Sequence, residues 1–373
     1  MRRRLLSLAL LTIVVAAVLF TVPAVQGYDA LLALADLVGR PVPAWLDLRP
    51  VATRRAISYE LDGRRYDADL YQPAGAIRAG VVFVPGAVER GKDDARVVAF
   101  ATTLARARFT VLVPDIVALR ELRLLPDSAR DVADALSWLH AQPHLAPRGR
   151  LGVVTTSVGI GPAMLAMLEP GSATFVRYAV SIGGYYDLPR TLAYLTTGYY
   201  DAYGVTRRDP PNDYGKWIYA LSNAMRLKDA AERGAFEALA RRKLADPQAD
   251  VSAELRRLGP DGERAYEFIV NTDPARARVL LESLPEYLRA DVDRLNLATR
   301  DLTTLAPRFI LVHGADDNLI PPGESMGLAA ALPPGQVRLF VLAGFYHVEM
   351  SPQLVDGLRL ARALYALLAE RRR

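Results

Sequence analysis

The sequence contains no cysteine and only four histidines among its 373 residues. The absence of cysteine excludes disulfides, thiolate metal sites and a cysteine nucleophile. The histidines, His140, His144, His313 and His347, show neither an HxH nor an HExxH spacing. Because zinc sites in proteins are built mainly from these two residue types, we expect neither a metal nor a bound cofactor.

The body of the sequence also lacks an excess of basic residues, although the net charge of the whole chain is +5. Six arginines stand at the two chain ends, in residues 2–4 and 371–373, and the remaining 40 basic residues are matched by 41 acidic ones. A nucleic-acid binder concentrates lysine and arginine on a folded face. The charge distribution therefore argues against a nucleic-acid partner.

Charge is absent from residues 5–22, directly after the three N-terminal arginines. This run is longer than the apolar region of most signal peptides and close to the length that spans a bilayer. The arginines would remain cytoplasmic. We predict that residues 1–26 are a signal anchor or a cleaved signal peptide and that residues 27–56 are a stalk or linker. The protein would then be exported, either anchored in the inner membrane and facing the periplasm or exterior, or secreted.

Apolar runs and helical periodicity alternate through most of the remaining chain. The predicted strands are 57–61, 65–71, 80–84, 110–113, 151–154, 178–182, 308–312 and 337–342. Strands that alternate with helices predict a mainly parallel sheet flanked by helices on both faces. Residues 189–302 instead show helical patterns throughout. We expect one α/β domain, residues 57–188 and 303–373, with an all-helical cap inserted between the sixth and seventh core strands.

Residues with catalytic chemistry follow three of the predicted strand ends. Ser157 lies between strand 151–154 and a helix, with Gly159 two residues on, as in a nucleophile elbow. Asp316 and Asp317 follow strand 308–312, and His347 follows strand 337–342. A serine needs a base within hydrogen-bond reach and a carboxylate that orients the base. The alternative for Ser157 taken alone is a helix cap.

The order serine, acid, histidine and the motifs around it resemble the α/β-hydrolases, in the group of serine esterases, lipases and dienelactone hydrolases. The resemblance implies Ser157 as nucleophile, His347 as general base and Asp317 as acid, with Asp316 or Asp187 as alternatives for the acid. It also implies an oxyanion hole formed by the backbone N–H groups of Ala87 and Val158. His313 matches a common residue of the family with a structural role. The sequence departs from the family pattern at Thr155, where glycine is usual, and at Pro85, where histidine is usual.

Nine of the 17 tyrosines fall between Tyr178 and Tyr219. We expect Tyr185, Tyr186 and Trp217 to line a pocket above Ser157, because aromatic rings suit apolar ligands that carry a few polar groups. Ordinary helix packing is the alternative explanation for these aromatic residues.

The sequence therefore predicts a serine hydrolase that cleaves a carboxylic ester or related acyl bond of a small molecule through an acyl-enzyme. Two alternatives stay open. One is a catalytically silent α/β-hydrolase-fold binding protein tethered to the membrane. The other is a phosphate-loop nucleotide binder, because residues 86–92 spell GxxxxGK after a strand. Asp93 stands where such a loop needs a hydroxyl residue, which counts against the second alternative.

Overall fold

The computed structural model describes residues 23–40, 42–347, 349–350 and 354–373. The predicted signal or anchor segment lies outside these ranges as far as residue 22. Within them, no helix combines the length and the apolar character that crossing a bilayer requires.

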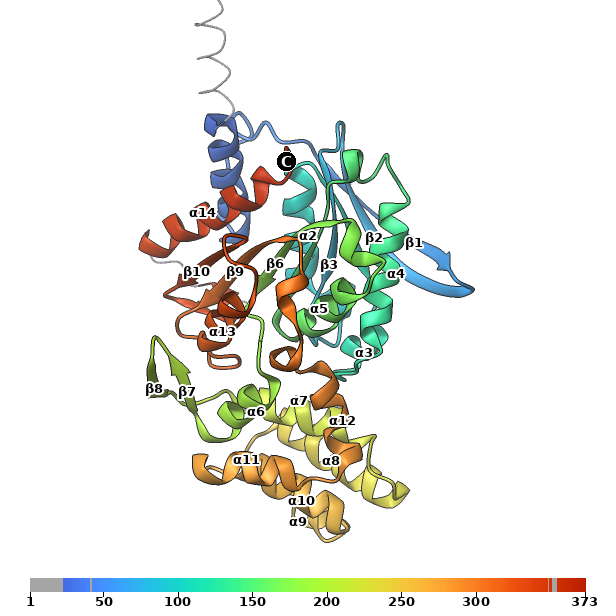
Figure 1. The fold of residues 1–373 in the computed structure, drawn as a ribbon, viewed down its shortest axis with the longest axis vertical. Coiled ribbons are helices and arrows are strands. Elements are labelled where there is room, and N and C mark those ends of the chain that lie inside the picture. The colour runs from blue at the N-terminus through green and yellow to red at the C-terminus, as the bar shows by residue number, and fades with distance from the viewer. Residues whose placement is uncertain (1–22, 41, 348, 351–353) are drawn as a thin grey trace, which may run out of the picture.

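A mixed sheet of eight strands forms the centre of the molecule (Figure 1). Its spatial order is β1-β2-β4-β3-β5-β6-β9-β10. Strand β2 runs antiparallel to β1 and β4, and all other neighbours are parallel. The strands are β1 (Ala52–Leu61), β2 (Arg64–Pro73), β3 (Ala79–Val84), β4 (Phe109–Pro114), β5 (Leu151–Thr156), β6 (Val176–Ile182), β9 (Arg308–Gly314) and β10 (Val337–Leu342). All eight predicted core strands are present, seven of them with somewhat wider bounds and β10 with the predicted bounds.

Alternate residues of the buried strands enter two separate apolar cores, one on each face of the sheet. Val82 and Val84 of β3 face α4 (Ser128–His140) and α5 (Ile160–Leu168), with α13 (Gly323–Ala331) on the same side. Phe83 instead packs into the core formed by α2 (Ala95–Arg106) and α14 (Leu354–Ala369). Burial on both faces explains why these strands are continuous apolar runs in the sequence.

The insertion between the sixth and seventh core strands is mainly helical and lies at the lower end of Figure 1. The sequence predicts an all-helical cap, and this is wrong in one detail. Strands β7 (Tyr199–Ala202) and β8 (Val205–Arg208) form an antiparallel hairpin within the insertion. Tyr203 and Gly204 at its turn have φ angles of 55° and 77°, which suits a type I′ turn. The helices of the insertion are α6 (Leu188–Thr197), α7 (Asp213–Ala224), α8 (Ala230–Ala245), α9 (Ser252–Leu255), α10 (Pro260–Val270), α11 (Pro274–Ser283) and α12 (Glu286–Leu295).

Apart from the N-terminal helix, the remaining regular elements among the described residues are short. They are helix α3 (Val117–Arg120), the paired strands β11 (Phe345–Tyr346) and β12 (Glu349–Met350), and six 3₁₀ turns at Gly91–Asp93, Pro147–Gly149, Ser157–Gly159, Ser172–Thr174, Leu297–Thr299 and Leu302–Thr304.

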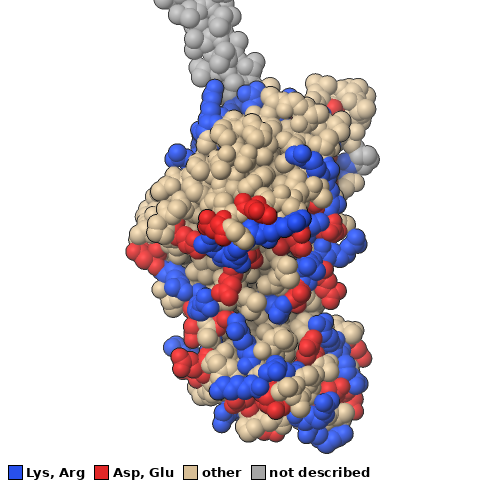
Figure 2. Space-filling model, turned by 90° about the vertical axis from the view of Figure 1, so that its right-hand side faces the viewer, with Lys and Arg blue, Asp and Glu red and all other residues tan. Residues whose placement is uncertain are grey.

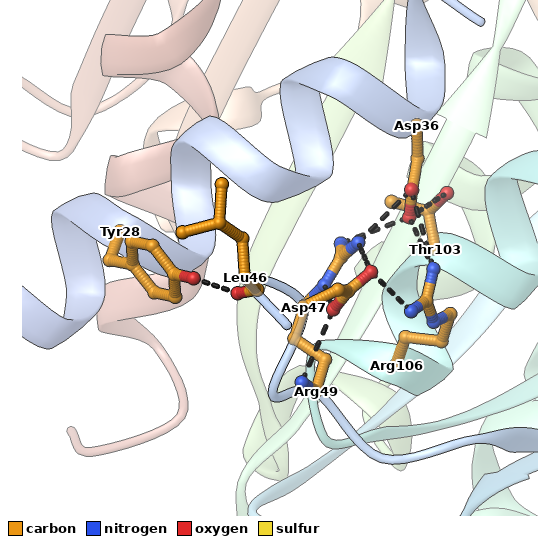
Figure 3. Close-up of polar contacts among 7 residues, drawn as sticks. All are labelled: Tyr28, Asp36, Leu46, Asp47, Arg49, Thr103 and Arg106. Atoms are coloured by element: carbon orange, nitrogen blue, oxygen red, sulfur yellow. Dashed lines mark hydrogen bonds and ion pairs between the residues drawn. The ribbon is translucent and has the colours of Figure 1, made fainter. Parts of the chain in front are cut away.

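Residues 23–37 form a helix that packs on the body at the end opposite the cap (Figure 1). Ala30 and Ala33 are buried in the core that contains α2 and α14. Asp36, together with Asp47 of the following loop, is bound by Arg49 and Arg106 (Figure 3). Residues 27–37 of the predicted stalk or linker are therefore helical and packed on the body. Its residues 52–56 belong to β1, so the first strand begins at Ala52 rather than at residue 57.

Candidate active site

Ser157 lies at the end of β5, on a tight turn that leads into α5. Its φ angle is 53°, in the left-handed region that residues other than glycine rarely adopt. A Cβ atom at Gly159 would come within 2.7 Å of the Pro85 carbonyl oxygen, and one at Gly86 within 2.9 Å of the Ser157 Cβ. The turn therefore requires glycine at both positions, and it is the strand–turn–helix of a nucleophile elbow.

Thr155, where the family pattern has glycine, is buried within β5. Its hydroxyl donates a hydrogen bond of 3.3 Å to the Val180 carbonyl of the neighbouring strand. This hydroxyl has a partner inside the sheet, so the departure from glycine leaves no unpaired polar group at the elbow.

The ends of three strands bring Ser157, His347 and Asp317 together. His347 Nε2 lies 2.8 Å from Ser157 Oγ, and His347 Nδ1 lies 2.9 Å from Asp317 Oδ2. Ser157 follows β5, Asp317 follows β9, and His347 follows β10. These distances are within hydrogen-bond range, so the three side chains form one connected chain of proton donors and acceptors.

Asp317 is buried, and both of its carboxylate oxygens have hydrogen-bond partners. Its Oδ1 accepts the backbone N–H groups of Leu319 and Ile320, both at 2.9 Å. Burial on its own would raise the pKa of Asp317, but the charge and hydrogen bond of His347 and those of His313 outweigh burial and hold this pKa below its ordinary value. Asp317 is thus kept as a carboxylate facing the His347 ring.

His313 is fully buried beside this carboxylate. Its Nε2 lies 2.8 Å from the Ile320 carbonyl oxygen, and its Nδ1 lies 2.6 Å from Ser325 Oγ. Because a carbonyl oxygen only accepts, Nε2 carries a proton there. His313 therefore fixes the loop that carries Asp317, in line with the structural role that the resemblance implies.

The two alternative acids have other partners. Asp316 Oδ2 accepts the backbone N–H of Gly344 at 2.9 Å, which ties the β9 loop to the loop that carries His347. Asp187 caps α6 by accepting the Arg190 N–H at 3.1 Å. Of the three candidates, Asp317 is the one hydrogen-bonded to His347.

Comparison with known proteins finds matches among solved structures but none in sequence. No family model and no curated protein sequence matches the chain. A solved structure of a Legionella pneumophila protein, provisionally named a hydrolase, superposes with a TM-score of 0.55 at 13% identity, covering 91% of this chain and 94% of that one. An esterase from Pyrobaculum calidifontis gives 0.46 at 16% identity, with 94% and 92% covered. A dienelactone hydrolase from Anabaena variabilis gives 0.44 at 15% identity, with 84% and 96% covered.

The chain has the α/β-hydrolase fold. The resemblance seen in the sequence is thereby confirmed at the level of the fold. The helical insertion between β6 and β9 occupies the position of a cap in this fold.

In an α/β-hydrolase, one oxyanion donor is the N–H that follows the nucleophile and the other comes from the loop after β3. Val158 and Ala87 occupy these places, and both line the same cavity as Ser157. Gly86 N–H donates to Thr156 Oγ1 at 3.0 Å, which holds the β3 loop against the elbow. Since only the backbone of this loop is required, Pro85 in place of histidine is compatible with a donor here.

The cavity that contains Ser157 and His347 has a volume of about 1070 Å³. The aromatic residues that we expected in its wall lie elsewhere. Tyr185 is buried, and its hydroxyl donates to the Leu295 carbonyl at 2.9 Å. The backbone N–H of Tyr186 donates to Glu324, and Trp217 is buried in the core. The aromatic residues that do line the cavity are Phe83, Phe100, Tyr214, Tyr219 and Tyr346.

Helical geometry explains the error on α7. Tyr214, Gly215, Ile218 and Tyr219 line the cavity, and their positions i, i+1, i+4 and i+5 place them along one face of the helix. Trp217 lies between them in sequence and is directed into the core. The periodicity of α7 was a usable signal for this difference, whereas aromatic content alone was not.

The GxxxxGK loop of the alternative nucleotide-binding hypothesis is neutralised by carboxylates. Lys92 Nζ lies 3.0 Å from Asp93 and 3.5 Å from the buried Asp69. Arg54 bonds to both of these carboxylates as well. Lys92, the lysine of the motif, therefore anchors the loop to β2 and is not directed at an empty anion site.

Proposed function

We propose that this protein is a serine hydrolase that cleaves carboxylic esters through an acyl-enzyme intermediate. The observation that carries the proposal is the hydrogen-bonded chain from Ser157 through His347 to Asp317, with Ser157 on a strained turn in the wall of a large cavity. A serine hydroxyl is activated as a nucleophile when a base lies within hydrogen-bond reach and a carboxylate orients that base.

In the proposed reaction, Ser157 Oγ attacks the ester carbonyl while His347 Nε2 takes its proton. The backbone N–H groups of Ala87 and Val158 stabilise the oxyanion that develops. Protonated His347 then delivers the proton to the leaving alcohol. A water molecule attacks the acyl-enzyme with His347 as base, and Ser157 leaves with the proton.

Asp317 acts through His347 in this scheme. Because its pKa is held below the ordinary value, Asp317 carries its negative charge at neutral pH. It keeps the proton of neutral His347 on Nδ1, which leaves Nε2 free to accept the proton of Ser157. It also stabilises the imidazolium that forms during the attack.

Labelling with a fluorophosphonate tests the proposal, using the full-length chain in mild detergent. Wild type is expected to react covalently, S157A not at all, and H347A at least roughly 100-fold more slowly, since a lost general base typically costs that much or more. S58A is the matched control, because Ser58 is exposed and lies on β1. Labelling of S157A at the wild-type rate, or a folded wild type that never labels, would refute the proposal.

We also propose that the protein is exported and held at a membrane by its N-terminal segment. The support is the uncharged run 5–22 together with apolar side chains exposed at the same end of the molecule: Trp45 is 77% and Leu48 79% exposed. In Figure 2, a broad part of this end is uncharged, whereas charges of both signs are mixed over the cap. Exposed apolar groups of this kind are typical of surfaces that contact lipid or another protein.

A further inference from the structure

The cavity at Ser157 continues past the catalytic side chains onto the face of the sheet that α2 and α14 cover. Its walls there include Val180 and Ile182 of β6 and Ile310 and Val312 of β9. The facing stripe on α14 is Leu360, Ala363, Leu364 and Leu367, at the spacing of one helix face. We call this part of the cavity the inter-layer channel.

The register of the sheet gives the direction of the channel. Ile182 pairs with Thr156, the neighbour of Ser157, and also with Val312. Val180 pairs with Ile310 one step further from the site. Side chains two residues apart on a strand are about 6.6 Å apart, so the channel descends along the strands, away from the cap. It extends to residues 36–38 at the end of the N-terminal helix.

The chemistry of the channel is that of a hydrocarbon site. Its strand and α14 walls are apolar, and the acidic group at its far end, Asp36, is bound by Arg49, Thr103 and Arg106 (Figure 3). Polar side chains line the cavity on the cap side instead, among them Asn212, Asn318 and Tyr214. Protein interiors are normally packed without such space, and apolar cavities bind apolar ligands in preference to water.

We propose that the inter-layer channel binds the acyl chain of a long-chain fatty ester, with the ester carbonyl at Ser157 and the alcohol on the cap side. This inference rests on the proposed hydrolase function and names its substrate class. A polar or branched acyl group would meet apolar walls on both sides of the channel, whereas an unbranched hydrocarbon chain can lie along the groove between the layers.

The chain-length profile of the full-length protein tests this assignment. We expect kcat/KM for p-nitrophenyl esters to rise at least tenfold from butyrate to laurate, since each buried methylene contributes up to roughly fourfold. A363F places a ring in the channel, and it should lower the laurate-to-butyrate ratio at least tenfold. V180F tests the same channel from the opposite wall. L358F is the control, because Leu358 lies on α14 and is 60% exposed.

The outcomes separate the two proposals. Hydrolysis of butyrate with no preference for longer chains, and an unchanged ratio in both A363F and V180F, would overturn the channel assignment while leaving the hydrolase intact. Selective loss of dodecyl acetate hydrolysis in A363F, with laurate esters unaffected, would also overturn it, because the channel would then hold the alcohol. Failure of wild type to label with fluorophosphonate or to cleave any ester would refute the hydrolase itself. Binding of dodecanoate to S157A, and its loss in S157A/A363F, would support the channel without requiring turnover.

Discussion

At the scale of single residues, the backbone of Ser157 contributes as much to the site as its hydroxyl. A left-handed φ costs a serine of the order of 1–2 kcal/mol, and the neighbouring strands and helix must supply that energy. In the proposed mechanism the strain has a chemical use, because the turn holds Oγ 2.8 Å from His347 Nε2. Gly86 and Gly159 make the close approach of the β3 loop to the turn sterically feasible.

The role of Asp317 gives a prediction at this scale. In D317N, the amide oxygen can still accept the N–H groups of Leu319 and Ile320, but its NH₂ group would face His347 Nδ1. The histidine would then carry its proton on Nε2 and could not accept the proton of Ser157. We expect kcat for p-nitrophenyl butyrate to fall roughly 1,000- to 10,000-fold, as loss of the correct tautomer does in other triads.

The matched control is D316N, since an amide oxygen at position 316 can still accept the Gly344 N–H. We expect it to change kcat less than about threefold. A large loss of kcat in D316N with an active D317N would reassign the acid.

The lowered pKa of Asp317 also predicts how stability depends on pH. The Asp317 carboxylate stabilises the fold above about pH 4, and this contribution is lost as the pH falls. The stability gap between wild type and D317N, measured by urea unfolding, should therefore narrow toward low pH.

At the scale of elements, the ion cluster in Figure 3 attaches the N-terminal helix and the following loop to α2. Arg49 is buried and lies 2.9 Å from both Asp36 and Asp47. In R49A these two carboxylates would share Arg106 alone, and a broken buried ion pair costs about 3–5 kcal/mol. We expect R49A to lose about that much stability in urea unfolding and to become sensitive to proteolysis within residues 38–50.

The control for this variant is R55A, because Arg55 is exposed on β1. Hydrogen bonds from Arg49 are the main reason why the pKa of Asp47 lies below its ordinary value. The contribution of Asp47 to the free energy of unfolding is therefore complete above about pH 4 and is lost at lower pH. The difference in stability between wild type and R49A should accordingly become smaller in acid. An R49A variant as stable and protease-resistant as R55A would show that the cluster does not hold the segment.

The elements that the sequence identified are those whose signal is local. The buried strand at 151–154 and the helix at Ser128–His140 follow from runs and periodicity alone, and the structure has both. The β7–β8 hairpin was missed because its strands have only four residues each, although Tyr203-Gly204 between Tyr, Val and Thr was a usable turn signal. The helix at 23–37 was recognisable, but its attachment was not, because Asp36 and Arg106 lie 70 residues apart.

At the scale of the whole molecule, the candidate site was more predictable than its cavity. Chain order and strand ends pointed to Ser157, to an acid after strand 308–312 and to His347, and the family resemblance favoured Asp317, the acid that lies next to His347 in the structure. The cavity depends on how closely α2 and α14 approach the sheet, and Ile310 and Ala363 look like ordinary core residues in the sequence. A void between layers is a property of packing across the whole fold, which no local pattern encodes.

The proposed attachment to a membrane is also a property of the whole molecule, and it gives the last prediction. The cap lies at one end and the helix of residues 23–37 at the other, so an anchor formed by residues 1–22 would leave the cap furthest from the lipid (Figure 1). We expect the full-length chain, expressed in a Gram-negative bacterium, to stay in the membrane fraction after a carbonate wash. Its cap should be cleaved by protease added to spheroplasts.

A charge within the apolar run should weaken this anchoring, because an arginine near the centre of a spanning helix costs about 3 kcal/mol. V15R is therefore expected to reduce carbonate-resistant protein, whereas L31R, at an exposed position of the packed helix, should not. A mature chain that begins near residue 25 and is released into the soluble fraction would refute the anchor but support export. A soluble chain of full mass that is protected from protease in spheroplasts would refute export itself, because the three N-terminal arginines and the run behind them would then not direct the chain across the membrane.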